Sequence, residues 1–128
     1  MNSMFTQIVR VALGLTLVIF GANMIHNFLP FDAPDANTAA GQFMNSLGAT
    51  GYIFPVVGAL EVIIGIQLLL KKWVAFALIL LAPISINILL FHLFLDIPGM
   101  SLLIAVVILV FNTLLIFKHW TQYRPLFY

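Results

Sequence analysis

The sequence of 128 residues contains no cysteine, and this absence excludes several classes of protein. Disulfide bonds, thiolate zinc sites, iron–sulfur clusters and thiol–disulfide exchange all require cysteine sulfur. The four-helix membrane thiol oxidoreductases, which have a similar length, are therefore excluded as well.

Charged residues are also scarce, since the chain has five Lys and Arg and four Asp and Glu, with a formal net charge of +1. Nucleic-acid binding needs clustered basic residues, so no nucleic-acid partner is expected. By contrast, 63% of the residues are hydrophobic and the mean hydropathy is +1.16. A soluble domain of this size cannot bury so much apolar surface, so the surrounding solvent must be lipid.

The apolar residues fall into four long runs, which predict an all-α membrane protein with a four-transmembrane-helix bundle in a single domain, residues 1–128. The expected spans are residues 8–28, 51–70, 73–95 and 100–117. At ~1.5 Å per residue the first run is ~30 Å long, the thickness of the hydrocarbon core. Backbone polar groups in lipid must be satisfied within each span, so these spans must be helices. No A-x-A cleavage site follows the first run, so we expect a span there rather than a signal peptide.

A long connection, residues 29–50, separates the first two spans and predicts a short helix from about residue 38 to 47. Asp35 or Asn37 is the expected N-cap, and Asp96 is expected to cap the fourth span in the same way. Apolar residues recur at helical spacing at Ala40, Phe43, Met44 and Leu47. An amphipathic helix on the membrane surface is therefore expected, with a partly ordered loop as the alternative.

The charges predict the topology. All Lys and Arg fall on the side of the N-terminus, at Arg10, Lys71, Lys72, Lys118 and Arg124, whereas Asp32, Asp35 and Asp96 fall on the other side. Positive residues are retained in the cytoplasm, so both termini are expected to be cytoplasmic and the protein to be a multi-pass protein of the cytoplasmic (inner) membrane. The tail from Lys118 mixes aromatic and basic residues, as interfacial anchors do.

Glu61 is the sole acidic residue within the four predicted spans. A carboxylate near mid-bilayer costs roughly 3 kcal/mol, so we expect Glu61 to be neutral and hydrogen-bonded, or charged beside a cation or a bound ligand. It shares a helix face with Gly58 and Gly65, and small residues let another helix approach closely, so Glu61 should point into the bundle. It then serves either as a ligand or proton site, or as a helix–helix hydrogen bond that sets the packing.

Other polar residues fall in the outer half of the spans. Asn23 and His26 share a face of the first span, while Asn87 and His92 lie in the third span, beyond a kink expected at Pro83. The candidate ligand-binding set is Glu61, His26, Asn23, Asn87 and His92, which we expect around one polar pocket. The alternatives are an interhelical hydrogen bond for each Asn and an interfacial position for each His.

No established cofactor or catalytic motif is present. The histidines and Glu61 lack a metal-binding spacing, so no metal site is expected, and the chain has neither a nucleotide-binding nor a nucleophile motif. Histidine is a usual axial ligand of haem, but nothing in the spacing of His26 and His92 favours haem. The sequence points to no catalytic residue.

Three segments resemble the DoxX family of small membrane proteins, and the resemblance extends over nearly the whole length. They are residues 10–23 (RVALGLTLVIFGAN), 50–70 (TGYIFPVVGALEVIIGIQLLL) and 80–96 (LLAPISINILLFHLFLD). The resemblance implies a four-helix membrane protein linked to redox-associated complexes, since the family is named for a small subunit of an archaeal thiosulfate:quinone oxidoreductase. It matches Glu61 to the acid in the second helix of the family. Asn23 falls near a position where many members carry Lys, so a simple Lys–Glu pair is not expected here.

The hypothesis from the sequence is a redox-associated subunit that binds a quinone or a similar lipophilic ligand near Glu61, because a protonated Glu or a His supplies the hydrogen bond that a quinone needs. The alternative is a non-enzymatic scaffold or assembly factor in which Glu61 serves helix packing. A third hypothesis, passage of a solute or proton, requires an oligomer. The expected partners are the lipid bilayer, a membrane redox protein and further copies of the chain.

Overall fold

The computed structural model describes residues 3–29, 34–95 and 100–127, and the regular elements in these ranges are all helices. In chain order they are α1 (Met4–Ile25), α2 (Ala39–Ala49), α3 (Ile53–Leu70), α4 (Val74–Phe94), α5 (Met100–Lys118), α6 (Trp120–Tyr123) and the 3-10 helix η1 (Arg124–Phe127). Four of them, α1, α3, α4 and α5, are long and apolar enough to cross a membrane. The predicted four-helix fold, with a short helix between the first two spans, is confirmed.

The first helix is shifted toward the N-terminus, since it covers Met4–Ile25 rather than residues 8–28. It begins early because the Ser3 side chain accepts a hydrogen bond from the backbone N–H of Thr6, as N-caps do. It ends early because the Asn23 side-chain oxygen accepts from the backbone N–H groups of Phe28 and Leu29, both at 2.8 Å. These bonds turn the chain out of the helix.

The N-cap of α2 differs from the prediction. Thr38 caps the helix, because its hydroxyl oxygen accepts from the backbone N–H of Gly41 at 3.1 Å. The Asp35 carboxylate instead accepts from the backbone N–H of Asn37 at 3.0 Å, which forms the turn before the cap. A Cβ at Gly41 would lie 2.0 Å from the Asp35 carbonyl oxygen, so only glycine fits under this turn. The expected cap at Asp96 lies outside the described residues.

The turn between α3 and α4 is tight. Lys71 and Trp73, on either side of Lys72, both adopt left-handed backbone conformations, with φ of 58° and 53°. The backbone N–H of Lys72 donates to the carbonyl of Gln67 at 2.9 Å, which closes the end of α3. Few residues connect the two helices, so α3 and α4 run antiparallel from a common end.

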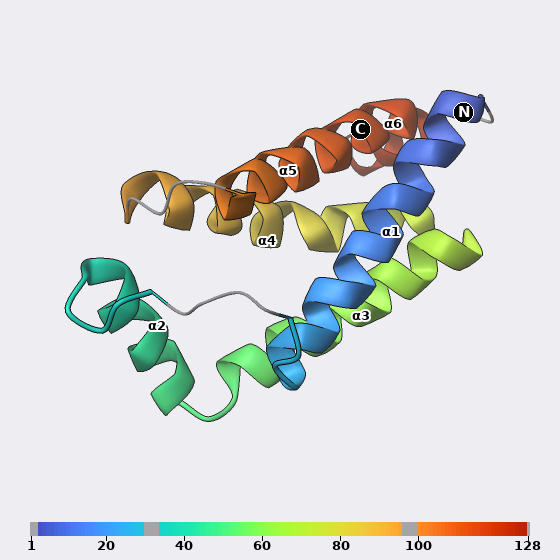
Figure 1. Ribbon diagram of the computed structural model, residues 1–128. Helices are drawn as coiled ribbons and strands as arrows, with labels where there is room; N and C mark the ends of the chain where they lie inside the picture. Colours follow the sequence, from blue (N-terminus) through green and yellow to red (C-terminus); the bar gives the residue numbers. More distant parts are fainter. Residues whose placement is uncertain (1–2, 30–33, 96–99, 128) are drawn as a thin grey trace.

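The four long helices form two pairs, α1 with α3 and α4 with α5 (Figure 1). The pairs draw apart toward the end that carries α2, whereas the chain termini lie at the opposite end (Figure 1). The main core belongs to the half near the termini and consists of Val9, Leu13, Leu17, Ile64, Leu68, Val74, Ala77, Leu78, Leu81, Ile108 and Leu115. The bundle is therefore held together mainly from that half.

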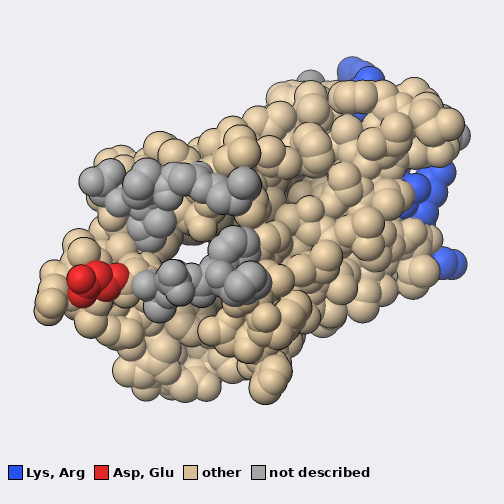
Figure 2. All heavy atoms as spheres, in the orientation of Figure 1, with Lys and Arg blue, Asp and Glu red and all other residues tan. Residues whose placement is uncertain are grey.

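The basic side chains gather at the end of the bundle that holds the termini, and the acidic side chain in view lies at the opposite end (Figure 2). This separation follows the charge pattern of the sequence. Cytoplasmic termini stay a prediction from the positive-inside rule.

Candidate functional site

Glu61 lies in the middle of α3, and its side chain is 3% exposed. At ~1.5 Å per residue it lies roughly 14 Å from the end of α3 at Leu70. It faces α1, because a Cβ built at Gly21 would lie 2.8 Å from the Cβ of Glu61. Glu61 therefore points into the bundle, as its position on the glycine face predicts.

Four glycines form the seam between α1 and α3. A Cβ at Gly58 would lie 2.6 Å from the Gly21 carbonyl oxygen, and a Cβ at Gly65 would lie 2.7 Å from the Gly14 carbonyl oxygen. The two glycines of each helix are about two turns apart, so both pairs meet along one antiparallel seam. No side chain fits between the helices at these points, so the backbones touch directly.

The carboxyl group of Glu61 has no hydrogen-bond or ion-pair partner in the part of the chain that the structure describes. A protonated carboxyl group has one O–H donor and acceptor oxygens, and those of Glu61 are not wholly enclosed by the described residues. Because burial fixes the side chain while no described protein group hydrogen-bonds to the carboxyl group, that group can bind another molecule.

Asn23 and His26 lie at the C-terminal end of α1, where the helix stops. Asn23 uses its side-chain oxygen on the two backbone N–H groups that follow the helix. His26 is the C-cap residue and is exposed, and its backbone N–H donates to the carbonyl of Ala22 at 2.9 Å. The described role of Asn23 is to terminate α1.

Asn87 and His92 bond within their own helix. The exposed Asn87 amide donates to the Pro83 carbonyl at 2.7 Å. The Nδ1 of the half-buried His92 donates to the Ile88 carbonyl at 2.8 Å. The His92 ring packs edge-on against Phe91, whose own ring contacts Phe43 of α2 with centroids 5.5 Å apart.

Glu61 and His92 lie at different depths in the bundle. At ~1.5 Å per residue, His92 lies roughly 27 Å from the start of α4, about 13 Å farther than Glu61 from the turn that joins α3 and α4. Among residues 3–29, 34–95 and 100–127, no hydrogen bond or ion pair joins any two of the five. The structure brings Glu61 together with Gly21 and Gly58, while a shared pocket with the other four residues stays a prediction.

A buried polar cluster between α4 and α5 was missed by the sequence analysis. The Ser85 hydroxyl donates to the Asn112 side-chain oxygen at 2.9 Å, and the Asn112 amide donates to the Leu78 carbonyl at 3.1 Å. Ser85 and Asn112 are 0% and 1% exposed. Asn112 is the sole Asn of the fourth apolar run, which was a signal in the sequence that an interhelical bond forms there.

Arg10 also has a structural role beyond its use as a marker of topology. Its guanidinium group donates to the carbonyl of Leu68, near the C-terminus of α3. The last carbonyls of a helix lack partners within the helix and carry partial negative charge, so a cation stabilises them. Close by in sequence, the Gln67 side-chain oxygen is buried without a hydrogen-bond partner among the described residues.

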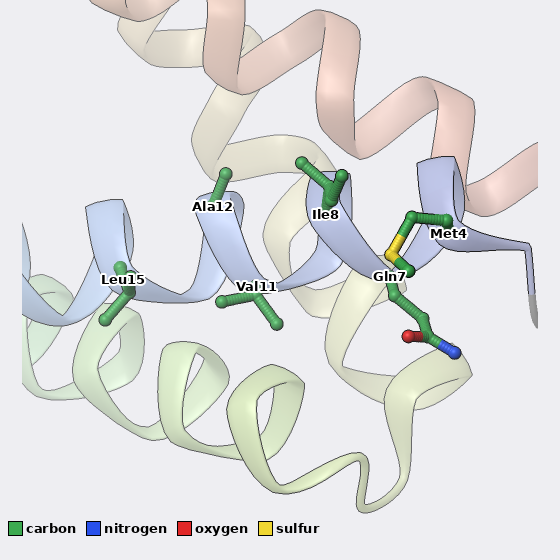
Figure 3. Close-up of a pocket in the computed structure, with 6 residues that line it drawn as sticks. All are labelled: Met4, Gln7, Ile8, Val11, Ala12 and Leu15. Carbon is green, nitrogen blue, oxygen red and sulfur yellow. The ribbon is translucent and has the colours of Figure 1, made fainter.

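An open groove runs along the outside of α1 (Figure 3). All of its lining residues belong to α1, namely Met4, Gln7, Ile8, Val11, Ala12 and Leu15. Its lining is almost entirely apolar, and Met4 and Ile8 are well exposed, so this groove opens to the outside of the bundle. None of the five candidate residues lines it.

The fold and its apolar surface define a multi-pass α-helical membrane protein. Within the described ranges, no three His, Cys, Asp or Glu side chains gather in a way that could hold a metal ion. No family model matches the chain, and searches of curated proteins and of solved structures gave no match either.

Proposed function

We propose that the protein is a small redox-associated subunit of the cytoplasmic (inner) membrane that binds a quinone or a similar lipophilic ligand at Glu61. The observation that carries the proposal is the Glu61 carboxyl group, which is buried yet unpartnered among the described residues. A protonated carboxyl group donates one hydrogen bond, and a quinone carbonyl accepts one. Such a ligand would satisfy the carboxyl group and would enter from lipid without being desolvated from water.

The packing of the outer half supports a route for the ligand to Glu61. Toward the α2 end, the buried residues of the four long helices stop at Gly21 on α1, Gly58 on α3, Ser85 on α4 and Ala105 on α5, as far as the structure describes them. Glu61 lies one turn from Gly58 and so near this limit. An elongated apolar molecule could therefore reach Glu61 from the loosely packed half.

The redox association and the partner follow from the resemblance to the DoxX family, and a membrane redox protein is the proposed partner. A quinone is the single cofactor proposed. A bound haem would contradict this and would appear at once as visible absorbance of the purified protein.

The second candidate function is a non-enzymatic scaffold or assembly factor, and the glycine seam favours it. Glu61 packs directly beside Gly21 on the seam between α1 and α3. In this alternative Glu61 contributes to helix packing, within one copy or between copies of the chain, and no ligand binds it.

A thermal-shift titration with a short-tailed benzoquinone separates the two functions. Wild-type protein in detergent should gain thermal stability as the quinone is added, because a ligand that binds only the native state stabilises it. Glu61→Gln keeps the shape but replaces the O–H donor by an amide, so its quinone affinity should differ from that of the wild type. Glu61→Leu removes both hydrogen-bonding groups and should abolish the quinone-dependent shift.

Asp35→Asn is the matched control, because it makes the same change from carboxyl to amide in the turn before α2. It should leave the quinone-dependent shift intact. If wild type, Glu61→Gln and Glu61→Leu show equal affinity, Glu61 is not the ligand site. If the substitutions change only the melting temperature without quinone, the packing function is the correct one.

A further inference from the structure

The end of the bundle that holds the termini combines basic and aromatic side chains from two distant segments. We call it the basic face and define it as residues 71–76 and 117–127. The Tyr123 hydroxyl donates to the Ala75 carbonyl at 2.6 Å, and this bond holds the second segment against the start of α4. Tyr123 itself is 3% exposed, so the contact is a packed one.

The cations of the basic face point outward. Lys72 and Lys118 are exposed and come one from each segment, and Lys71 and Arg124 are exposed as well. The sequence has no Asp or Glu in residues 62–95 or 97–128, so neither segment carries an acidic side chain beside Lys72 or Lys118. The face therefore has a positive potential, and its complement is an anion.

Large aromatic side chains lie beside these cations. Trp73 is 75% exposed and Trp120 is 45% exposed. The Trp120 ring stacks on Phe127 with centroids 5.9 Å apart, which fixes its position. Tryptophan prefers the headgroup level of a bilayer, so these rings place Lys72 and Lys118 at the depth of lipid phosphates.

We propose that the basic face binds anionic phospholipid headgroups in preference to zwitterionic ones. Charge complementarity selects the occupant, because a lipid phosphate without a balancing ammonium group is the anion found at this depth. Each Lys or Arg near an anionic surface adds up to about a fivefold gain in association, and the gain is screened by salt. This inference is independent of any ligand at Glu61.

Tryptophan quenching by brominated lipids tests this directly, because the chain has two Trp residues, Trp73 and Trp120, and both belong to the basic face. The protein is reconstituted in vesicles that contain phosphatidylcholine and phosphatidylglycerol, with bromine on the chains of one lipid at a time. The wild type should associate with phosphatidylglycerol roughly fivefold more strongly than with phosphatidylcholine at low salt. This preference should shrink in 0.5 M sodium chloride.

The double variant Lys72→Gln/Lys118→Gln should lose most of the preference, and Lys72→Arg/Lys118→Arg should keep it. Helicity measured in the same vesicles checks that each variant folds, and the salt dependence of the wild type needs no variant at all. Equal quenching by both lipids in the wild type, or an unchanged preference in the glutamine variant, would overturn the proposal. So would inorganic phosphate that abolishes the preference at an ionic strength where chloride does not, because that result points to a site for the free anion.

Discussion

Gly21 and Gly58 meet backbone to backbone, and a Cβ added at Gly58 would lie 2.6 Å from the carbonyl oxygen of Gly21. Real Cβ atoms are not found so close to a backbone oxygen, so any side chain at Gly58 must push α1 and α3 apart. The contact lies one turn from Glu61, which ties the stability of the seam to the position of the candidate ligand group.

Gly58→Ala should destabilise the protein by about 1–3 kcal/mol, because overpacking forces a shift of the backbone. Gly48→Ala in α2 is the matched control, since its Cβ would lie 3.6 Å from the ring of Phe54, an ordinary contact. The control should be neutral or slightly stabilising, because alanine favours a helix over glycine. Thermal unfolding in detergent, monitored by the helical circular dichroism signal, measures the stability of both variants. A melting temperature of Gly58→Ala equal to that of the wild type would contradict the close backbone contact at the seam.

Asn112→Ala should cost about 1 kcal/mol, because it removes an interhelical bond to the Leu78 carbonyl and the acceptor of Ser85. Asn87→Ala is the control, as Asn87 is exposed and bonds within its own helix. Ser85→Ala combined with Asn112→Ala should cost less than the sum of the two single changes, because they share one bond. Additive losses in the same unfolding measurement would show that the cluster does not act as a unit.

Tyr123 should titrate at unusually high pH. Burial raises the pKa of Tyr123 from its ordinary value of 10.0 to about 12, because the ionised phenolate is poorly solvated. In the unfolded chain the proton leaves near pH 10, so the unfolded state holds fewer protons between pH 10 and 12. The stability from the neutral phenol is therefore fully present below pH 10 and is lost as the pH rises to about 12.

Tyrosinate absorbance measured against pH checks this titration. Subtracting the titration curve of Tyr123→Phe from that of the wild type isolates the contribution of Tyr123. The variant should lose the component that ionises near pH 12 and, at neutral pH, about 1 kcal/mol from the missing bond to the Ala75 carbonyl. A wild-type titration that matches the variant above pH 11 would mean that Tyr123 is solvated.

Both termini should be cytoplasmic, and the lack of native cysteine makes this easy to test. Asn45→Cys in α2 and Gln122→Cys in α6 are both at exposed positions on opposite ends of the bundle. A membrane-impermeant maleimide added to intact cells should label Asn45→Cys alone, and cell lysis should make Gln122→Cys reactive. The reverse pattern would invert the topology.

The sequence was sufficient for the fold, because span length and hydropathy are local properties of the chain. It also indicated which way Glu61 points, since Gly58 and Gly65 mark a helix face by spacing alone. Helix ends were less predictable, because the bonds from Asn23 to Phe28 and Leu29 depend on how the chain leaves the helix. The partner of Asn112 was not readable, since it lies on another helix whose register only the packing determines.

The glycine pairs on α1 and α3 set the register of the two helices. Because Gly14 meets Gly65 and Gly21 meets Gly58, sliding either helix by one residue would drive side chains into backbone at both points. The depth of Glu61 is thus fixed by backbone fit alone and owes nothing to what its carboxyl group binds. The group can therefore take up or release a ligand or a proton while the helix that carries it stays in place.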